Sequence, residues 1–448
     1  MRRLLTVAFS LLLGTAPSVE AADTLRLSLA EAVQMALAPQ GNLRVEAARA
    51  DLEAARARTD ISRGALLPHL RALVDQRRLT RNLEALGLRD QGGNFRPPRL
   101  VGPFSTFDAR AQIDQTVFDW SALKELQASE ASAEGALHDL ERTRDLVAAE
   151  VCRIYLQALR ARADLEAAQA DVELARSLLE TAGRRLQAGT GIRLEETRAA
   201  VQLSNQQQRL LVAQNRLGRA YLHLQRVIGA EIGAPIELTD RLERDSAPLM
   251  DARQADETAR ASRPDLKALE DQVRSAQRRV RAAWARHLPS VAAFADYGSS
   301  GIYADDSLPT WTLGLRLDIP IFQGGRLKAQ QAEARALLRR RQALLQDLRQ
   351  EVELEVRLAL TGARLADQQV QVSREGLDLA QEELERAQRR YRAGVANSLE
   401  VTEAQASLER ARENYNSALF ESGTARVELR AAIGTIRSHL GPIGQREE

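Results

Sequence analysis

The sequence predicts a mainly α-helical protein with a membrane β-barrel part. Three observations predict this fold class: a plan that occurs twice in the 448 residues, long stretches with a heptad repeat, and segments in which apolar and polar residues alternate. Aromatic residues make up only 4% of the chain. A chain poor in bulky core residues suits long helices that pack closely.

The N-terminus has the three parts of a secretory signal peptide. Arg2 and Arg3 form a basic region, Leu4–Leu13 is a short apolar core, and a small-residue cleavage site ends at Ala21. We therefore expect residues 1–21 to be a signal peptide that is removed. The alternative is a membrane-anchor helix, which is disfavoured because the apolar run is too short to span a bilayer.

The net charge of +2 argues against a nucleic-acid partner, since such proteins concentrate basic residues on one face. Basic runs such as Arg339–Arg341 and Arg389–Arg392 lie in helical patterns rich in Glu and Gln, and they are interpreted as solvated helix faces. Cys152 is the only cysteine, so an intrachain disulfide is excluded. No later segment approaches the roughly 18 apolar residues of a membrane helix.

The chain consists of two halves built on one plan, residues 22–250 and 251–448. The stretch GTGIRLEETRAA from Gly189 and the stretch GVANSLEVTEAQ from Gly394 match at an offset of 205 residues (394 − 189). A second pair of matching stretches ends at Pro68 and at Pro289. Each half contains a helix, an alternating segment, a polar loop, a second alternating segment, a very long helix, a Gly turn and a shorter helix.

The long helices are predicted at Ser121–Ala188 and Arg326–Ala393, each about 100 Å long at 1.5 Å per residue. Their apolar residues recur in steps of four and three, which indicates a left-handed coiled seam. Shorter helices at Val45–Leu66 and Leu194–Gly229 would stack end to end along one long helix. The predicted seam positions are Val147, Val151, Ile154, Ala158, Ala161, Leu165, Ala168, Val172, Ala175, Leu179, Ala182 and Leu186 in the first half, and Val352, Val356, Ala359, Ala363, Ala366, Val370, Ser373, Leu377, Ala380, Leu384, Ala387 and Tyr391 in the second.

The alternating segments predict strands at residues 107–118 and 311–322, with weaker partners at about 70–76 and 291–298. One reading is an antiparallel sheet on a soluble core, and the other is a set of membrane-spanning barrel strands. Segments of ten to twelve residues are long enough to span a membrane, since a spanning strand needs about 9–11. Aromatic residues at the segment ends would form a belt at the membrane interface: Phe118, Trp120, Trp311 and Phe322.

Four strands cannot close a barrel. An open sheet edge is not tolerated in lipid, because its backbone groups have no hydrogen-bond partner there. If these strands span a membrane, several chains must therefore share one barrel.

The strand-to-helix stretch LRLDIPIFQGGRLKAQQAEA, from Leu315 to Ala334, resembles the signature of TolC-like outer-membrane efflux proteins. The paired Leu-Pro helix ends and the two Gly turns resemble the same family. The resemblance implies a homotrimer in which each protomer gives four strands to a shared twelve-stranded barrel and its helices to a periplasmic α-barrel. It also implies an exit duct in the outer membrane, extending into the periplasm, for a tripartite efflux pump or a type I secretion system, with a periplasmic adaptor protein, an inner-membrane pump and outer-membrane lipid as partners.

The two Gly turns become the tips of this duct. Glycine permits the positive φ that a helix end needs, and Asn397 and Ser398 can cap the returning helix. The resemblance makes the tips the docking site for the adaptor. The expected docking residues are Gly189, Leu194, Glu195, Gly394 and Leu399.

Glu400 and Glu403 share a helix face and align with the acidic pair that forms the pore constriction in family members. The alternative is that glutamate in a first helical turn merely favours the positive end of the dipole. Tyr391 matches a position that helps to hold the tip closed. The first repeat has Glu195 and Arg198 instead of two acids. Two further positions depart from the family pattern: Ala396 replaces a basic latch residue, and Phe118-Asp119 replaces the usual Gly-Gly before Trp120.

No catalytic constellation, metal site or cofactor site is expected. The histidines lack metal-ligand spacing. Ser121–Lys124 fits an S-x-x-K pattern without companion motifs, and the Gly189 turn lacks the third glycine of a dinucleotide loop. A secreted, soluble coiled-coil scaffold is the alternative function; it accounts for the heptads but not for the alternating strands with aromatic ends.

Overall fold

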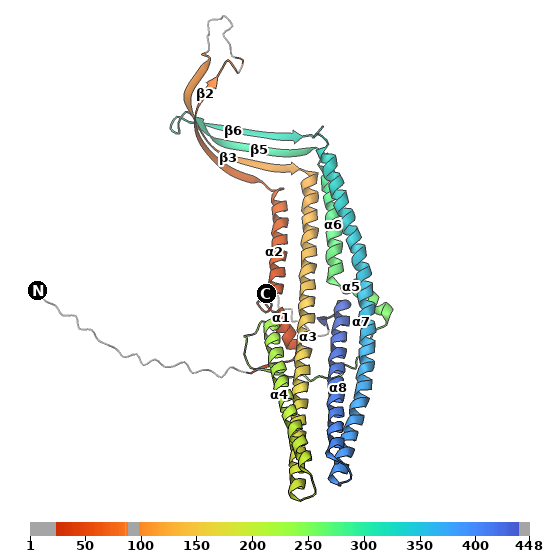
Figure 1. Cartoon of the computed structure of the whole chain (residues 1–448). Coiled ribbons are helices and arrows are strands. Elements are labelled where there is room, and N and C mark those ends of the chain that lie inside the picture. Colours follow the sequence, from red (N-terminus) through yellow and green to blue (C-terminus); the bar gives the residue numbers. More distant parts are fainter. Residues whose placement is uncertain (1–23, 86, 88–97, 439–448) are drawn as a thin grey trace, which may run out of the picture.

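The computed structural model describes residues 24–85, 87 and 98–438. The predicted signal peptide, residues 1–21, lies outside the described residues. The helices form one elongated body with a β-sheet at one end and two helical turns at the other (Figure 1). Within the described ranges, no helix combines the length and the apolar character needed to cross a membrane.

Two very long helices run through the whole body. Helix α3 spans Trp120–Gln187, and helix α7 spans Arg326–Arg392; they contain 68 and 67 residues. At 1.5 Å per residue each is about 100 Å long. Asp119 begins α3 by accepting hydrogen bonds from the Ser121 and Ala122 amides at 2.8 and 3.1 Å. Gly325 begins α7 with a φ of 82°.

The heptad positions are buried along α7. Ten of the twelve predicted positions are buried, while Ala359 and Ser373 are half-buried and Leu360 is buried beside them. In α3, seven predicted positions are buried: Val147, Val151, Ala158, Ala161, Val172, Ala175 and Ala182. The seam is therefore real, and its alanines let the neighbouring helices come close.

Each long helix is accompanied by shorter helices laid end to end. Helices α2 (Leu43–Gly64) and α4 (Arg193–Ile228) pack along α3, and helices α6 (Pro264–Ala285) and α8 (Ser398–Ala432) pack along α7. Helix α3 also contacts α6 and α8, which joins the two halves. Toward the turns the helices lie in the order α4, α3, α8, α7 (Figure 1).

Both Gly turns have the same backbone. Gly189, just after the end of α3, has a φ of 70°, and Gly394, just after the end of α7, has a φ of 76°. The amide of Thr190 donates to the Arg185 carbonyl at 3.0 Å, and the amide of Val395 donates to the Arg390 carbonyl at 3.1 Å. This six-to-one bond across a left-handed glycine is the Schellman motif. The repeated sequence thus encodes a repeated helix stop.

The middle of the helical body, called the waist here, contains elements that were not predicted from the sequence. Helices α1 (Leu29–Leu37) and α5 (Ala252–Ser262) lie there, with a parallel pair of strands, β1 (Leu25–Leu27) and β4 (Ile236–Leu238). The buried Tyr155 hydroxyl of α3 donates to the Asp240 carboxylate at 2.8 Å and lies 2.9 Å from the Leu27 carbonyl. These contacts fasten the N-terminal strand to the first long helix.

The sheet is antiparallel, with the order β2-β3-β5-β6. Its strands are β2 (His69–Asn82), β3 (Leu100–Phe118), β5 (Ser290–Gly301) and β6 (Leu308–Asp318). The first three extend beyond the predicted ranges 70–76, 107–118 and 291–298. The fourth begins before 311 but ends at Asp318 instead of 322, because Pro320 has no amide to donate to a neighbouring strand.

We predict that Val172→Pro breaks α3. Proline removes the amide that bonds to the Ala168 carbonyl and clashes with that carbonyl, at a cost of about 3 kcal/mol or more. Val172→Ala is the matched control, because it removes buried methyl groups but keeps the amide. Urea unfolding of the purified variants measures the difference in unfolding midpoint. Equal unfolding midpoints for the two variants would show that α3 is not continuous at this point.

We also predict that Gly394→Ala destabilises the tip. The space around Gly394 is open, so the cost comes from the left-handed backbone and is about 1–2 kcal/mol. Gly218→Ala in α4 is the control, since its surroundings are also open but its backbone is helical. The control should gain up to about 1 kcal/mol in unfolding free energy. If both variants shift the unfolding free energy alike, the turn geometry is wrong.

Candidate channel site at the tips and the sheet

The tips present apolar side chains around the two glycines. Leu194 is 52% exposed and Leu399 is 47% exposed. Ile192 and Val395 are also exposed, beside Gly189 and Gly394 respectively. The side chain of Asn397 accepts a hydrogen bond from the Glu400 amide at 3.2 Å and caps α8, whereas α4 begins at Ile192 without a side-chain cap. Ser398 is buried as the first residue of α8 rather than serving as the cap.

The acidic pair lies in the first turns of α8, but its two members differ. Glu400 Oε1 forms an ion pair with Arg390 Nε at 2.8 Å. Glu403 is exposed, and its carboxylate forms no hydrogen bond or ion pair with another described residue. The charge of Glu400 is therefore compensated within the chain, and that of Glu403 is not. The run Arg389–Arg392 was interpreted from the sequence as a solvated helix face, so the ion pair between Arg390 and Glu400 was not predicted.

Tyr391 connects the two helical hairpins, α3–α4 and α7–α8, near their tips. The Tyr391 side chain, 2% exposed, belongs to a buried apolar cluster that contains residues of α3, α4, α7 and α8. The guanidinium of Arg185 lies 4.6 Å from its ring centroid, and Arg185 Nη1 donates to the Tyr391 carbonyl at 3.4 Å. Because Arg185 belongs to α3, this contact ties the tip of the first hairpin to the second. Glu195 is half-buried in the first turn of α4.

The sheet has one apolar face and one polar face, and the strand register aligns them. The apolar face consists of Leu70, Ala72, Val74, Ala109, Ala111, Ile113, Val291, Ala293, Ala295, Tyr297, Trp311, Leu313, Leu315 and Leu317. In the register Ala72 opposes Ala111, Ala111 opposes Tyr297, and Tyr297 opposes Trp311. Leu313 and Leu315 are 73% and 74% exposed, so no residue in the described part of the chain covers them.

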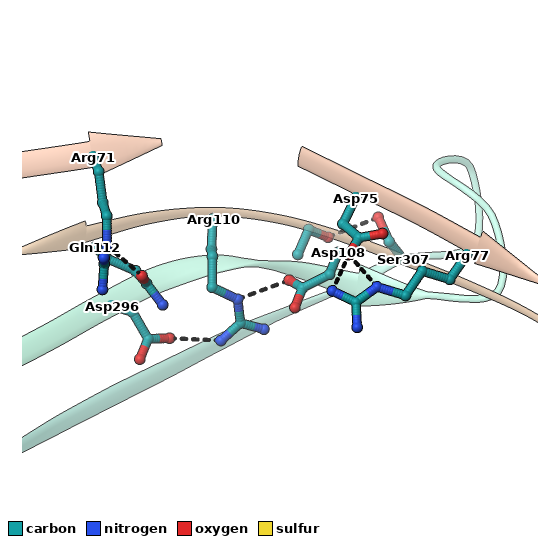
Figure 2. A network of polar contacts seen from close by, with 9 residues as sticks. Arg71, Asp75, Arg77, Asp108, Arg110, Gln112, Asp296 and Ser307 are labelled. Atoms are coloured by element: carbon teal, nitrogen blue, oxygen red, sulfur yellow. Dashed lines mark hydrogen bonds and ion pairs between the residues drawn. The ribbon is translucent and has the colours of Figure 1, made fainter. Parts of the chain in front are cut away.

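The polar face carries a network of charged side chains (Figure 2). The charged and other polar residues of this face include Arg71, Asp75, Arg77, Asp108, Arg110, Gln112, Asp114, Asp296, Thr312, Arg316 and Asp318. Alternation along residues 107–114 indicated Asp108 and Arg110 as polar-face residues. The partner Asp296 lies in the weaker segment, and only the strand register brings it to Arg110.

Three of the four predicted interface aromatics lie close to the helix–strand junctions. Phe118 ends β3, Trp120 begins α3 beneath it, and Phe322 lies in the segment between β6 and α7, where it is 85% exposed. Trp311 lies inside β6 rather than at its end, because the strand begins at Leu308. Lys124 Nζ lies 4.7 Å from the Trp120 ring centroid, which places a cation beside the aromatic ring.

No group of three or more His, Cys, Asp or Glu side chains in the described part of the chain is arranged to hold a metal ion. Cys152 is buried in α3, and burial raises the pKa of its thiol to about 11. A thiol of this kind is a packing residue rather than a nucleophile.

The chain resembles known outer-membrane proteins over most of its length. A family model described as outer membrane efflux protein matches residues 32–230 and 257–435. The pyoverdine export outer membrane protein OpmQ of Pseudomonas putida is 28% identical over 406 residues, which cover 87% of this chain and 82% of OpmQ. The alkaline protease secretion protein AprF of Pseudomonas aeruginosa is 25% identical, with 97% of this chain and 89% of AprF covered.

A solved structure has the same fold. The outer-membrane channel OprN superposes with a TM-score of 0.75 at 19% identity, covering 91% of this chain and 90% of OprN. The predicted fold class, long coiled helices joined to membrane strands, is thereby confirmed. The matched family model spans both repeats and leaves out only the ends of the chain and the connection between them, so the chain belongs to the outer membrane efflux protein family.

Proposed function

We propose that this chain is one protomer of a ring-shaped homotrimer, and that the trimer is the passive exit duct of a tripartite efflux pump or a type I secretion system. One observation carries the proposal. Within the described residues, a four-stranded sheet with an uncovered apolar face and two free edges is continuous with helices whose outer faces are also uncovered. Such a surface is complete only when copies of the chain stand side by side.

The sheet edges require a partner strand. Strands β2 and β6 each pair on one side only, among the described strands. In hydrocarbon each unpaired backbone group costs several kcal/mol, so an open edge cannot remain there. Pairing β6 of one copy with β2 of the next satisfies both edges. This contact is head-to-tail, and repeating it closes a ring.

Three copies give twelve strands (3 × 4). Two copies would give an eight-stranded barrel, whose interior is just filled by side chains. A twelve-stranded barrel is wider, so its polar face can line water. Three copies are therefore the smallest ring that supports conduction.

The outermost helices, α4 and α7, also carry exposed apolar residues that would be buried in the contact between copies. Helix α7 lies at one side of the row of helices and α4 at the other (Figure 1). On α7 an exposed stripe recurs at multiples of seven residues: Leu337, Leu344, Leu358, Leu365, Val372 and Leu379. On α4 the exposed apolar residues are Leu194, Val201, Leu211, Val212 and Leu222. Packing α7 of one copy against α4 of the next would bury both sets and build a helical tube beneath the barrel.

The duct conducts what other subunits deliver. OpmQ is named for pyoverdine export and AprF for alkaline protease secretion, yet this chain matches both along most of their length. Since one plan serves such different cargo, selection belongs to the inner-membrane transporter. The adaptor protein docks at the tips, where Leu194 and Leu399 are exposed beside Gly189, Glu195 and Gly394.

The entrance is narrowed by Glu400 and Glu403 from each protomer, with Tyr391 and its Arg185 contact holding the tips together. Since Arg390 neutralises Glu400, the three Glu403 carboxylates supply the uncompensated charge at this ring. A ring of carboxylates attracts multivalent cations.

We predict that Leu365→Glu combined with Val372→Glu disrupts assembly. Both side chains are exposed in the single chain, at 56% and 68%, and would be buried between copies, where unpaired carboxylates are costly. The control, Arg374→Glu with Asp378→Lys, changes charges on the exposed surface of the same helix. Size-exclusion chromatography with light scattering in detergent should show trimers for the wild type and the control, and monomers for the test variant.

The same preparations test conduction and location. The wild type should resist carbonate extraction from outer membranes and pass ions in planar bilayers, and the monomeric variant should not conduct. A wild-type monomer that is stably folded without detergent would overturn the proposed function.

We predict that Glu400→Ala with Glu403→Ala weakens block by multivalent cations by at least about tenfold, which corresponds to about 1.4 kcal/mol. Glu403→Ala alone should account for most of the loss, because Arg390 already compensates Glu400. Glu195→Ala at the first tip is the matched control. Single-channel recordings with a trivalent cation on the tip side measure the block. Unchanged block in the double variant would remove these residues from the constriction.

A further inference from the structure

We propose that Arg110, held between Asp108 and Asp296 on the polar face of the sheet, sets the ion selectivity of the barrel lumen. The proposal rests on the proposed function, because the polar face lines a water-filled lumen only in the closed ring. It concerns a second charged zone, at the opposite end of the duct from the acidic residues of the tip.

Arg110 lies at the centre of the polar network (Figure 2). Its Nε donates to Asp108 Oδ1 at 2.8 Å on the same strand, and its Nη1 donates to Asp296 Oδ1 at 2.9 Å on β5. One guanidinium thus serves two carboxylates. The group of three side chains, named here the aspartate–arginine triad, carries a net charge of −1 in each protomer.

The triad is fixed against the wall of the sheet. Asp296 is 12% exposed and Arg110 is 22% exposed, although the sheet is open to solvent in the single chain. Gly298 opposes Arg110 in the register, and a Cβ at Gly298 would lie 2.4 Å from the Arg110 Cβ. The backbone at Gly298 therefore lies too close to Arg110 for any side chain. A charge held in this way keeps its position while ions pass.

The other charges of the polar face largely cancel. Arg71 Nη2 lies 3.3 Å from Asp114 Oδ2, and Arg77 forms an ion pair with Asp75. Within the four strands, from their helix-side ends to the β2 bulge at Leu79–Arg81, the polar face carries both bases and acids. The bases are Arg71, Arg77, Arg110 and Arg316, and the acids are Asp75, Asp108, Asp114, Asp296 and Asp318. The acids exceed the bases by one, and the triad is the group that holds the excess.

Arg316 is held apart from the acids. Its guanidinium lies 5.1 Å from the ring centroid of Phe294, and no described carboxylate pairs with it. Gly314 leaves room for that ring, since a Cβ there would lie 2.6 Å from Phe294 Cζ. The base is thus stacked on the wall, and it does not compensate the triad directly.

Three triads in a ring make the lumen weakly cation-preferring. Removing the guanidinium leaves two uncompensated carboxylates per protomer, and removing Asp296 leaves a neutral pair. The two changes therefore shift selectivity in opposite directions. The effect should be large at about 0.01 M salt, where the Debye length is about 30 Å, and small at about 1 M, where it is about 3 Å.

The test is the reversal potential of single trimers in a KCl gradient at low salt. We use the Glu400→Ala/Glu403→Ala background, so that the tip does not set the selectivity. Arg110→Gln should raise the permeability ratio of K⁺ to Cl⁻ by at least about twofold, Asp296→Asn should lower it by a similar factor, and Arg110→Lys should leave it near the wild type. Arg78→Gln is the matched control, because it removes the same charge from the opposite face of the same sheet.

The outcomes separate the two proposals. If the wild-type protein forms no conducting trimers, the proposed function itself fails. If trimers conduct but Arg110→Gln and Asp296→Asn leave the permeability ratio unchanged, or if Arg78→Gln shifts it equally, the triad has only a structural role and this inference is overturned. Should Arg110→Gln fail to assemble, the opposite shift in Asp296→Asn still decides the question.

Discussion

The hydrogen-bonding needs of two free strand edges determine how the rest of this protein is built. Among the described strands, β2 and β6 each leave one row of amides and carbonyls unpaired, and hydrocarbon offers these groups no water. In the proposed ring, a neighbouring copy pairs with each edge. The same head-to-tail contact would cover apolar residues such as Leu358 and Val201, which are exposed on the outer helices of one chain. Lipid would then cover the apolar face of the sheet.

The helices suit a thin wall rather than a thick core. The seam inside each hairpin contains many alanines, which bring helix axes close together, while larger side chains such as Leu365 point away from it. A wall one helix thick encloses a wide space with little protein, but each helix buries only a narrow stripe. In the proposed trimer, contacts between copies would supply much of the stability. The waist contacts of Tyr155 fix the N-terminal segment within one chain.

The long helices could be predicted from the sequence because the same heptad pattern of apolar residues recurs along each of them. The heptads located α3 and α7 within one residue at each end, and the two Gly turns have the predicted positive φ. The waist strands β1 and β4 were missed because they have three residues each, too few for any periodic pattern. The pairs Arg390–Glu400, Arg185–Tyr391 and Arg110–Asp296 were missed for another reason. They depend on the packing between elements and on the strand register, which periodicity along a single segment does not specify.

The contacts between the two hairpins differ in kind from those within them. Each hairpin is held by an apolar seam, whereas part of the α3–α8 contact is polar, with Arg412 Nη1 2.7 Å from Asp171 Oδ1 and Asn416 Nδ2 2.9 Å from Asp164 Oδ1. Such bonds contribute only about 0.5–1.5 kcal/mol each when neutral and about 1.5–3 kcal/mol when charged, because water competes for the same groups. Breaking a seam instead exposes many apolar side chains at once. The contact between the hairpins thus combines polar pairs with the shared apolar cluster around Tyr391, whereas the contact within each hairpin depends on its apolar seam.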